Sequence, residues 1–154
     1  MNTNPEMRIE ELKLLLPPAA KPVGVYKPVL IIDKFLYVSG QGPLRSDGTF
    51  ITGRLGDNMS LEEGKLAARQ AGLTMLSTIK MQIGDLNQIK RIVKVLGMVN
   101  STQEFAQHPA VINGFSELMA EIFGDDHGIG VRSAVGMFLP MNIAVEVEAI
   151  FELA

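Results

Sequence analysis

The chain has 154 residues, which is close to the size of one domain, so we expect a single folded unit over residues 1–154. Its 14 Lys and Arg residues against 17 Asp and Glu residues give a formal net charge of −3, which argues against a broad electrostatic surface for nucleic acid or anionic membranes. With no cysteine in the sequence, a disulfide framework, a thiolate nucleophile and Cys-ligated zinc are excluded, and the composition suits a reducing cytosol.

The N-terminal segment predicts a short helix ahead of the main part of the domain. Asn4 suits the N-cap position of a helix over residues 5–16, which the pair Pro17-Pro18 would end. We therefore assign residues 1–17 to a helical extension. The first residues are polar, and nowhere do about 18 uncharged apolar residues stand together. No targeting signal or membrane-spanning segment is expected, and the default location is the cytoplasm.

Residues rich in β-branched and aromatic side chains come next and indicate strands. Residues 23–32 and 35–38 flank a turn at Asp33-Lys34, which is the pattern of a strand pair. Residues 49–52, which follow a second turn, predict a third short strand.

Two long helices are predicted from their caps and their apolar periodicity. Ser60 and Glu63 have the spacing of a capping box, so a long helix should begin there and end at Gly84. A second apolar stripe at helical spacing covers residues 111–122 and is ended by Gly124.

The remaining segments predict three more strands. Residues 88–100 are apolar on both faces, as in a central strand. After a polar loop over 125–130, strands over 131–139 and 144–153 are joined around residues 140–142. The order ββ(β)αβαββ favours an α+β fold with both helices on one face of a mixed sheet.

The sheet face opposite the helices would be too apolar to be left in water on a monomer. The residues expected there are Ile92, Leu96, Phe138 and Ile150. We therefore expect oligomerisation through that face.

Arg132 is the first candidate site residue. On a strand it shares a face with Ala134 and Gly136, whose small side chains would leave space beside the guanidinium. One hypothesis is a pocket floor with a cationic anchor for a small carboxylic acid, because guanidinium binds carboxylate in a bidentate manner. The other is a solvated arginine in a surface ion pair.

Three glutamates alternate with apolar residues on the final strand: Glu146, Glu148 and Glu152. They can form a solvated face, or one of them can orient a water molecule or transfer a proton. The histidines, His108 and His127, lack the spacing of a metal pair, so we expect no metal. A serine nucleophile has little support, because the G-x-S-x-G motif is missing.

Several ordered segments together resemble the YjgF/RidA family, whose members are often labelled L-PSP-type endoribonucleases or translation inhibitors. The matching segments are Tyr37-Val38-Ser39-Gly40-Gln41, Asn113 within residues 111–115, Arg132-Ser133-Ala134-Val135 and Val145-Glu146-Val147-Glu148-Ala149-Ile150. The family commonly has cysteine at the position of Ala134.

The resemblance implies a chorismate-mutase-like α+β subunit, a homotrimer, and sites in the clefts between neighbouring subunits. It also implies hydrolysis of reactive 2-aminoacrylate-type enamines and imines to 2-keto acids, with release of ammonia and without a cofactor. By position, Arg132 would hold the substrate carboxylate and Glu146 would position or activate water. Asn113, Tyr26 and Ser39 would line the cleft.

Two other functions remain open at this point. A ribonuclease or translation inhibitor should have a basic groove and histidine-type acid and base groups, and this acidic chain has two separated histidines. A non-catalytic trimer that binds small carboxylates would keep Arg132 and would not need a glutamate that activates water.

Overall fold

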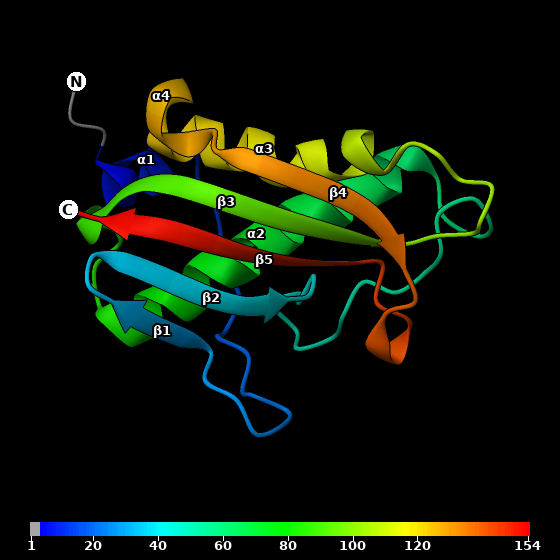
Figure 1. Cartoon of the computed structure of the whole chain (residues 1–154), viewed down its shortest axis with the longest axis horizontal. Helices are drawn as coiled ribbons and strands as arrows, with labels where there is room; N and C mark the ends of the chain where they lie inside the picture. The colour runs from blue at the N-terminus through cyan, green and yellow to red at the C-terminus, as the bar shows by residue number, and fades with distance from the viewer. Residues whose placement is uncertain (1–3) are drawn as a thin grey trace.

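The computed structural model describes residues 4–154, so residues 1–3 at the start of the expected extension lie outside the described residues. Five strands form one sheet, and two long helices pack on one of its faces (Figure 1). The strands are β1 (Val29–Ile32), β2 (Phe35–Gln41), β3 (Ile89–Asn100), β4 (Val131–Met137) and β5 (Val145–Leu153). The helices are α1 (Pro5–Glu11), α2 (Leu61–Ile83), α3 (His108–Phe123) and α4 (Asp125–Gly128), with single 3-10 turns η1 (Leu86–Gln88) and η2 (Pro140–Asn142).

The strand order is β1-β2-β5-β3-β4, and only β3 and β4 pair in parallel. The expected α+β fold, with a mixed sheet and both long helices on one face, is confirmed. The expected direct join of the last two strands does not make them neighbours, because β3 lies between β4 and β5. Parallel strands need a long crossover, and α3 supplies it between β3 and β4. The η2 turn then carries the chain across to the far side of β3.

The long helices form because their ends and faces are encoded locally. The Ser60 hydroxyl accepts from the Glu63 backbone N–H, and the Glu63 carboxylate accepts from the Ser60 N–H, so the predicted capping box is confirmed. Gly84 ends α2 with a φ of 86°, which favours glycine. Between the helices and the sheet lie fully buried large side chains, each of which contributes about 1.5–3 kcal/mol. They include Phe115, Phe123, Phe151, Leu36, Met75 and Leu118.

Three predicted elements differ in extent or kind. Helix α1 ends at Glu11, five residues earlier than predicted, because Lys13 adopts a φ of 54° and the chain leaves the helical conformation. Residues 49–52 make only isolated bridges, through Phe50 and Thr52. The predicted loop at 125–130 instead begins with the single helical turn α4.

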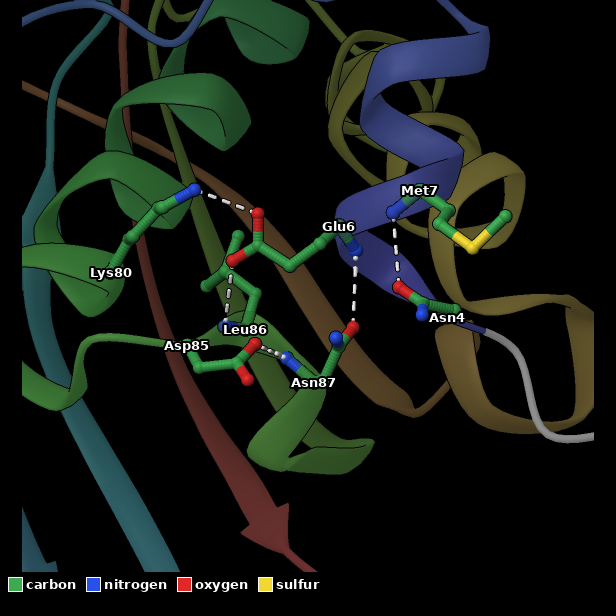
Figure 2. A network of polar contacts seen from close by, with 7 residues as sticks. All are labelled: Asn4, Glu6, Met7, Lys80, Asp85, Leu86 and Asn87. Atoms are coloured by element: carbon green, nitrogen blue, oxygen red, sulfur yellow. Dashed lines mark hydrogen bonds and ion pairs between the residues drawn. The ribbon is translucent and has the colours of Figure 1, made fainter.

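Helix α1 is fixed to the end of α2 and to η1 by a polar network (Figure 2). The Glu6 carboxylate accepts from Lys80 Nζ at 2.7 Å and from the Leu86 N–H at 3.0 Å. The Asn87 side-chain oxygen accepts from the Glu6 N–H at 3.2 Å, and Asn4 caps the helix by accepting from Met7. Burial alone would raise the pKa of Glu6, but the hydrogen bonds from Lys80 and Leu86 outweigh it and lower that pKa.

The sheet face opposite the helices, here called the open face, carries a groove of about 480 Å³. Its lining includes Leu30, Tyr37, Leu96 and Ile150 beside the charged side chains Lys27, Lys94 and Glu148. Two of the four residues expected on this face lie elsewhere. Ile92 is buried in the core on the helix side, and Phe138 lies beyond the end of β4 with 86% of its surface exposed. Among residues 4–154, no helix is long and apolar enough to cross a membrane.

Candidate active site

Arg132 projects from β4 toward α3, on the helix side of the sheet. Its Nη1 donates to Asn113 Oδ1 at 2.9 Å and to Ser116 Oγ at 3.1 Å, and its Nη2 donates to the Pro109 carbonyl at 3.4 Å. All three acceptors are neutral, and within residues 4–154 the guanidinium forms no ion pair. The surface ion pair considered for this arginine is therefore not present in the described chain.

The space beside Arg132 is not next to Gly136, where the small side chains of the strand predicted it. At Gly136, an added Cβ would come within 2.7 Å of His108 Nε2 and 2.8 Å of Ser101 Oγ, so those two side chains fill the expected gap. The open space instead borders Arg132 where β4 begins. There a cavity of about 510 Å³ is lined by Arg132, Asn113 and Ser116, and also by the acidic residues Glu117 and Asp125. We call Arg132, Asn113 and Ser116 the arginine cluster.

Glu146 projects from β5 on the open side of the sheet and is half-buried. It lies against Gly40, where an added Cβ would come within 2.7 Å of its Oε2, so the glycine makes room for the carboxylate. Glu146 lines a cavity of about 110 Å³ together with Tyr26, Gly40 and Met141. Burial raises the pKa of Glu146, and the nearby charge of Glu148 raises it further. We call this space the glutamate cavity.

The three glutamates of β5 have different surroundings. Glu152 is paired with Lys34 at 2.8 Å and with Lys90 at 3.3 Å, and the hydrogen bond from Lys34 is the main cause of its lowered pKa. Glu148 is exposed and lines the open-face groove. Only Glu146 is both half-buried and next to a cavity that a tyrosine lines. Their alternation in the sequence could not distinguish them, because their partners come from distant segments.

The remaining predicted site residues divide between two places. Tyr26 lies with Glu146 in the glutamate cavity, and Asn113 lies with Arg132 in the arginine cluster. Ser39 lines the neighbouring open-face groove, and its Oγ donates to the Lys27 carbonyl at 2.6 Å.

Sheet register places the arginine cluster and the glutamate cavity on opposite faces of the sheet. Met98 on β3 is opposite Glu146 on one side and Val135 on the other, so these three side chains share the open face. Arg132 lies three positions before Val135 on β4 and therefore points to the other face. Within one chain Arg132 and Glu146 do not share a cleft.

One pair of reactive side chains was missed by the sequence analysis. Ser101 Oγ lies 3.0 Å from His108 Nε2, and the Phe105 ring meets the imidazole edge to face at 5.2 Å between centroids. Ser101 follows β3 and His108 begins α3, so only the path of the connecting loop brings them together. Among residues 4–154, no three His, Cys, Asp or Glu side chains are arranged to hold a metal ion.

Comparison with known proteins identifies the family. A family model described as "YjgF/chorismate_mutase-like, putative endoribonuclease" matches residues 6–151. Protein TCP17 of Trypanosoma cruzi is 39% identical over 146 residues, which cover 94% of this chain and 91% of that protein.

Two solved structures are similar over nearly their whole length. Atu1372 from Agrobacterium tumefaciens, described as having unknown function, is 38% identical with a TM-score of 0.87, and the match covers 97% of this chain and 94% of that one. A "putative endoribonuclease" from Shewanella oneidensis is 34% identical with a TM-score of 0.92, and the match covers 97% and 99%. The resemblance seen in the sequence is thus confirmed, and the chain belongs to the YjgF/chorismate-mutase-like family.

Proposed function

We propose that this protein is a cytoplasmic hydrolase that deaminates reactive enamine and imine intermediates of small 2-keto acids. It would act as a homotrimer, without a cofactor, at sites between neighbouring subunits. The observation that carries the proposal is the state of Glu146, a half-buried carboxylate of raised pKa beside Gly40 and Tyr26 in a cavity. If the glutamates of β5 formed one solvated row, Glu146 would not differ from the others in burial and pKa.

The arginine cluster supports a carboxylate-binding role for Arg132. The guanidinium has five N–H donors, and the bonds to Asn113, Ser116 and Pro109 use three of them. The N–H of Nε and one N–H of Nη2 remain to bind the carboxylate of a 2-imino acid. Because α3 holds the side chain in place, little rotamer freedom is lost when the ligand binds.

The glutamate cavity supplies a group that can take up and return a proton. Water attacks the iminium carbon while Glu146 accepts one of its protons, which gives a neutral carbinolamine. Glu146 then returns the proton to nitrogen, the C–N bond breaks as ammonia leaves, and the regenerated carboxylate takes up the hydroxyl proton as the keto group forms. A carboxyl of raised pKa suits both steps, because it exchanges protons closer to neutral pH than an ordinary glutamate does.

The location of the two groups supports a site between subunits. Arg132 and Glu146 lie on opposite faces of the sheet in one chain, so a cleft that holds both needs a second copy. The apolar lining of the open-face groove supports assembly through that face.

Turnover of freshly generated 2-aminoacrylate or 2-iminobutyrate tests the proposal. The protein should accelerate release of the 2-keto acid and ammonia, and Glu146→Gln should lower that turnover by roughly 10²-fold or more. Glu152→Gln is the matched control, since it lies on the same strand, pairs with Lys34 and Lys90 away from the glutamate cavity and should change turnover little. Failure of the parent protein to accelerate 2-keto acid release, or equal losses in both variants, would refute the deaminase.

The description of the Shewanella oneidensis relative favours one alternative, an endoribonuclease. The same preparations incubated with single-stranded RNA address it. RNA cleavage that Glu146→Gln abolishes, without any imine hydrolysis, would assign the glutamate cavity to RNA instead.

A further inference from the structure

We propose that Ser101 and His108 form a second reactive site, in which Ser101 takes up the acyl group of a small ester whose acyl part is apolar. This site is separate from the arginine cluster and from the glutamate cavity, and the proposal does not rest on the deaminase function.

The two side chains have the geometry of a nucleophile and its base. Ser101 Oγ and His108 Nε2 are 3.0 Å apart. When the imidazole carries its hydrogen on Nδ1, Nε2 accepts the hydroxyl proton, and the serine oxygen becomes a better nucleophile. Ser101 is buried to 8% exposure, so its hydroxyl is held away from bulk water, while His108 is half-buried.

The surrounding backbone and side chains hold this pair in place. The Phe105 ring packs edge to face on the imidazole, with an interplanar angle of 88°, and limits its rotation. On the other side, β4 approaches so closely at Gly136 that an added Cβ would come within 2.7 Å of His108 Nε2 and 2.8 Å of Ser101 Oγ. A glycine at this position is therefore what allows the pair to sit against the strand.

The pair opens into a cavity of about 400 Å³. Phe105, Met137 and Phe138 supply apolar walls, and among residues 4–154 no Lys, Arg, Asp or Glu side chain lines the cavity. Arg54 lies over the outer ring, with its guanidinium carbon 5.3 Å from the Phe138 centroid. A neutral, apolar acyl group of a few carbons fits these walls better than a charged one, because a charge would lose its hydration without a partner.

The reaction expected of this pair is acyl transfer to serine. Ser101 Oγ attacks the ester carbonyl carbon while its proton passes to His108 Nε2. The tetrahedral adduct then collapses, the C–O bond to the alcohol breaks, and the alcohol leaves with the proton from Nε2. Water repeats the sequence on the acyl-serine and releases the carboxylic acid.

Labelling of the full chain with an alkyl fluorophosphonate tests the pair directly. Ser101 Oγ should attack phosphorus and displace fluoride, which leaves with the hydroxyl proton, and peptide mass spectrometry should locate the adduct on Ser101. Ser101→Ala should abolish the adduct, and His108→Gln should slow labelling by roughly 10²-fold or more, the size of a general-base contribution. Ser46→Ala and His127→Gln are matched controls outside the cavity and should label at the parent rate.

A third variant perturbs the geometry and leaves both reactive groups in the chain. Gly136→Ala should push Ser101 and His108 apart and slow labelling by at least tenfold. In a second assay, p-nitrophenyl butyrate should give a burst of nitrophenolate only with those variants that the fluorophosphonate labels. Circular dichroism melting shows whether Gly136→Ala folds. If it does not fold, the labelling rate of His108→Gln tests the proposal. A parent protein without an adduct on Ser101, or an adduct whose rate His108→Gln leaves unchanged, would overturn the proposal.

Discussion

The ionisation of Glu146 sets it apart from Glu152, although both lie on the same strand. Burial disfavours the charged form of Glu146, whereas Lys34 and Lys90 favour the charged form of Glu152. A raised pKa in the folded state favours folding at low pH, and that contribution is lost as the pH rises through the folded-state pKa. A lowered pKa has the opposite effect, so its contribution is lost as the pH falls through the folded-state pKa.

The stability of two variants should therefore change with pH in opposite directions. Glu146→Gln should gain stability relative to the parent as the pH rises from the ordinary glutamate value of 4.5 toward 8, because the buried charge is no longer formed. Glu152→Gln should be less stable than the parent by a constant amount above pH 4.5, because its two lysines lose their partner, and this difference should disappear as the pH falls below 4.5 through the lowered pKa of Glu152. Urea unfolding of each variant and the parent between about pH 2 and 8 measures both differences. If the stability differences of the two variants from the parent changed with pH in the same way, the burial of Glu146 and the lysine pairing of Glu152 would not set their pKa values.

Arg132→Lys keeps the charge of the arginine cluster and removes its planar fork. Lysine cannot bond Asn113 and Ser116 and still present two donors to a carboxylate, so binding of pyruvate or 2-ketobutyrate should weaken by about 1–3 kcal/mol. Titration calorimetry measures the affinity. Arg45→Lys is the control, because Arg45 is also exposed and bonds neutral acceptors, Thr49 and Phe50, away from the cluster. Equal affinities for Arg132→Lys and the parent would remove Arg132 from the site.

At the scale of elements, the Glu6 network makes α1 part of the folded unit. Glu6→Gln removes the ion pair with Lys80, so the end of α1 and the η1 turn should open more often, at a cost of about 1 kcal/mol. Hydrogen exchange at the Leu86 amide reports this opening. Glu10→Gln, an exposed change on the same helix, should leave that exchange rate unaltered. Unchanged protection of Leu86 in Glu6→Gln would mean that apolar packing alone holds α1.

The sequence predicted the long helices well because their signals are local. The capping box at Ser60 begins α2, glycines at 84 and 124 end α2 and α3, and each signal acts within one turn of its helix. Alternation predicted that Arg132 shares a face with Ala134 and Gly136, but it could not tell which face the helices cover, and Arg132 lies on the helix side.

Strand order and the contacts between distant residues could not be predicted in the same way. The insertion of β3 between β4 and β5 depends on how α3 packs across the sheet, and no short pattern encodes it. The separation of Arg132 from Glu146 depends on the register of these strands, and the meeting of Ser101 with His108 depends on the path of the loop between β3 and α3. Residues 49–52 have strand-like composition, yet they lack a long partner strand and form only bridges.

At the scale of the whole molecule, the open face is the surface that a monomer would leave exposed. We expect a trimer in solution, which light scattering coupled to size exclusion measures as three times the chain mass. Leu96→Glu would place a second negative charge beside Glu148, the residue opposite it on β5, and should dissociate the assembly. Leu66→Glu, at an exposed position on α2, should leave the mass unchanged. A parent protein that runs as a monomer at micromolar concentration would rule out this interface.

Because Arg132 and Glu146 lie on opposite faces of one sheet, mixed oligomers of two defective variants can show whether a site is shared between copies. If each working cleft takes its arginine from one copy and its glutamate from the next, two defective alleles can complement each other. Arg132→Lys and Glu146→Gln, each of low activity alone, should regain activity when unfolded together and reassembled. In an equal mixture about a quarter of the boundaries would join two intact halves, so roughly that share of the parent activity should return. A mixture that regains no activity would mean that the arginine and the glutamate of each site come from the same copy.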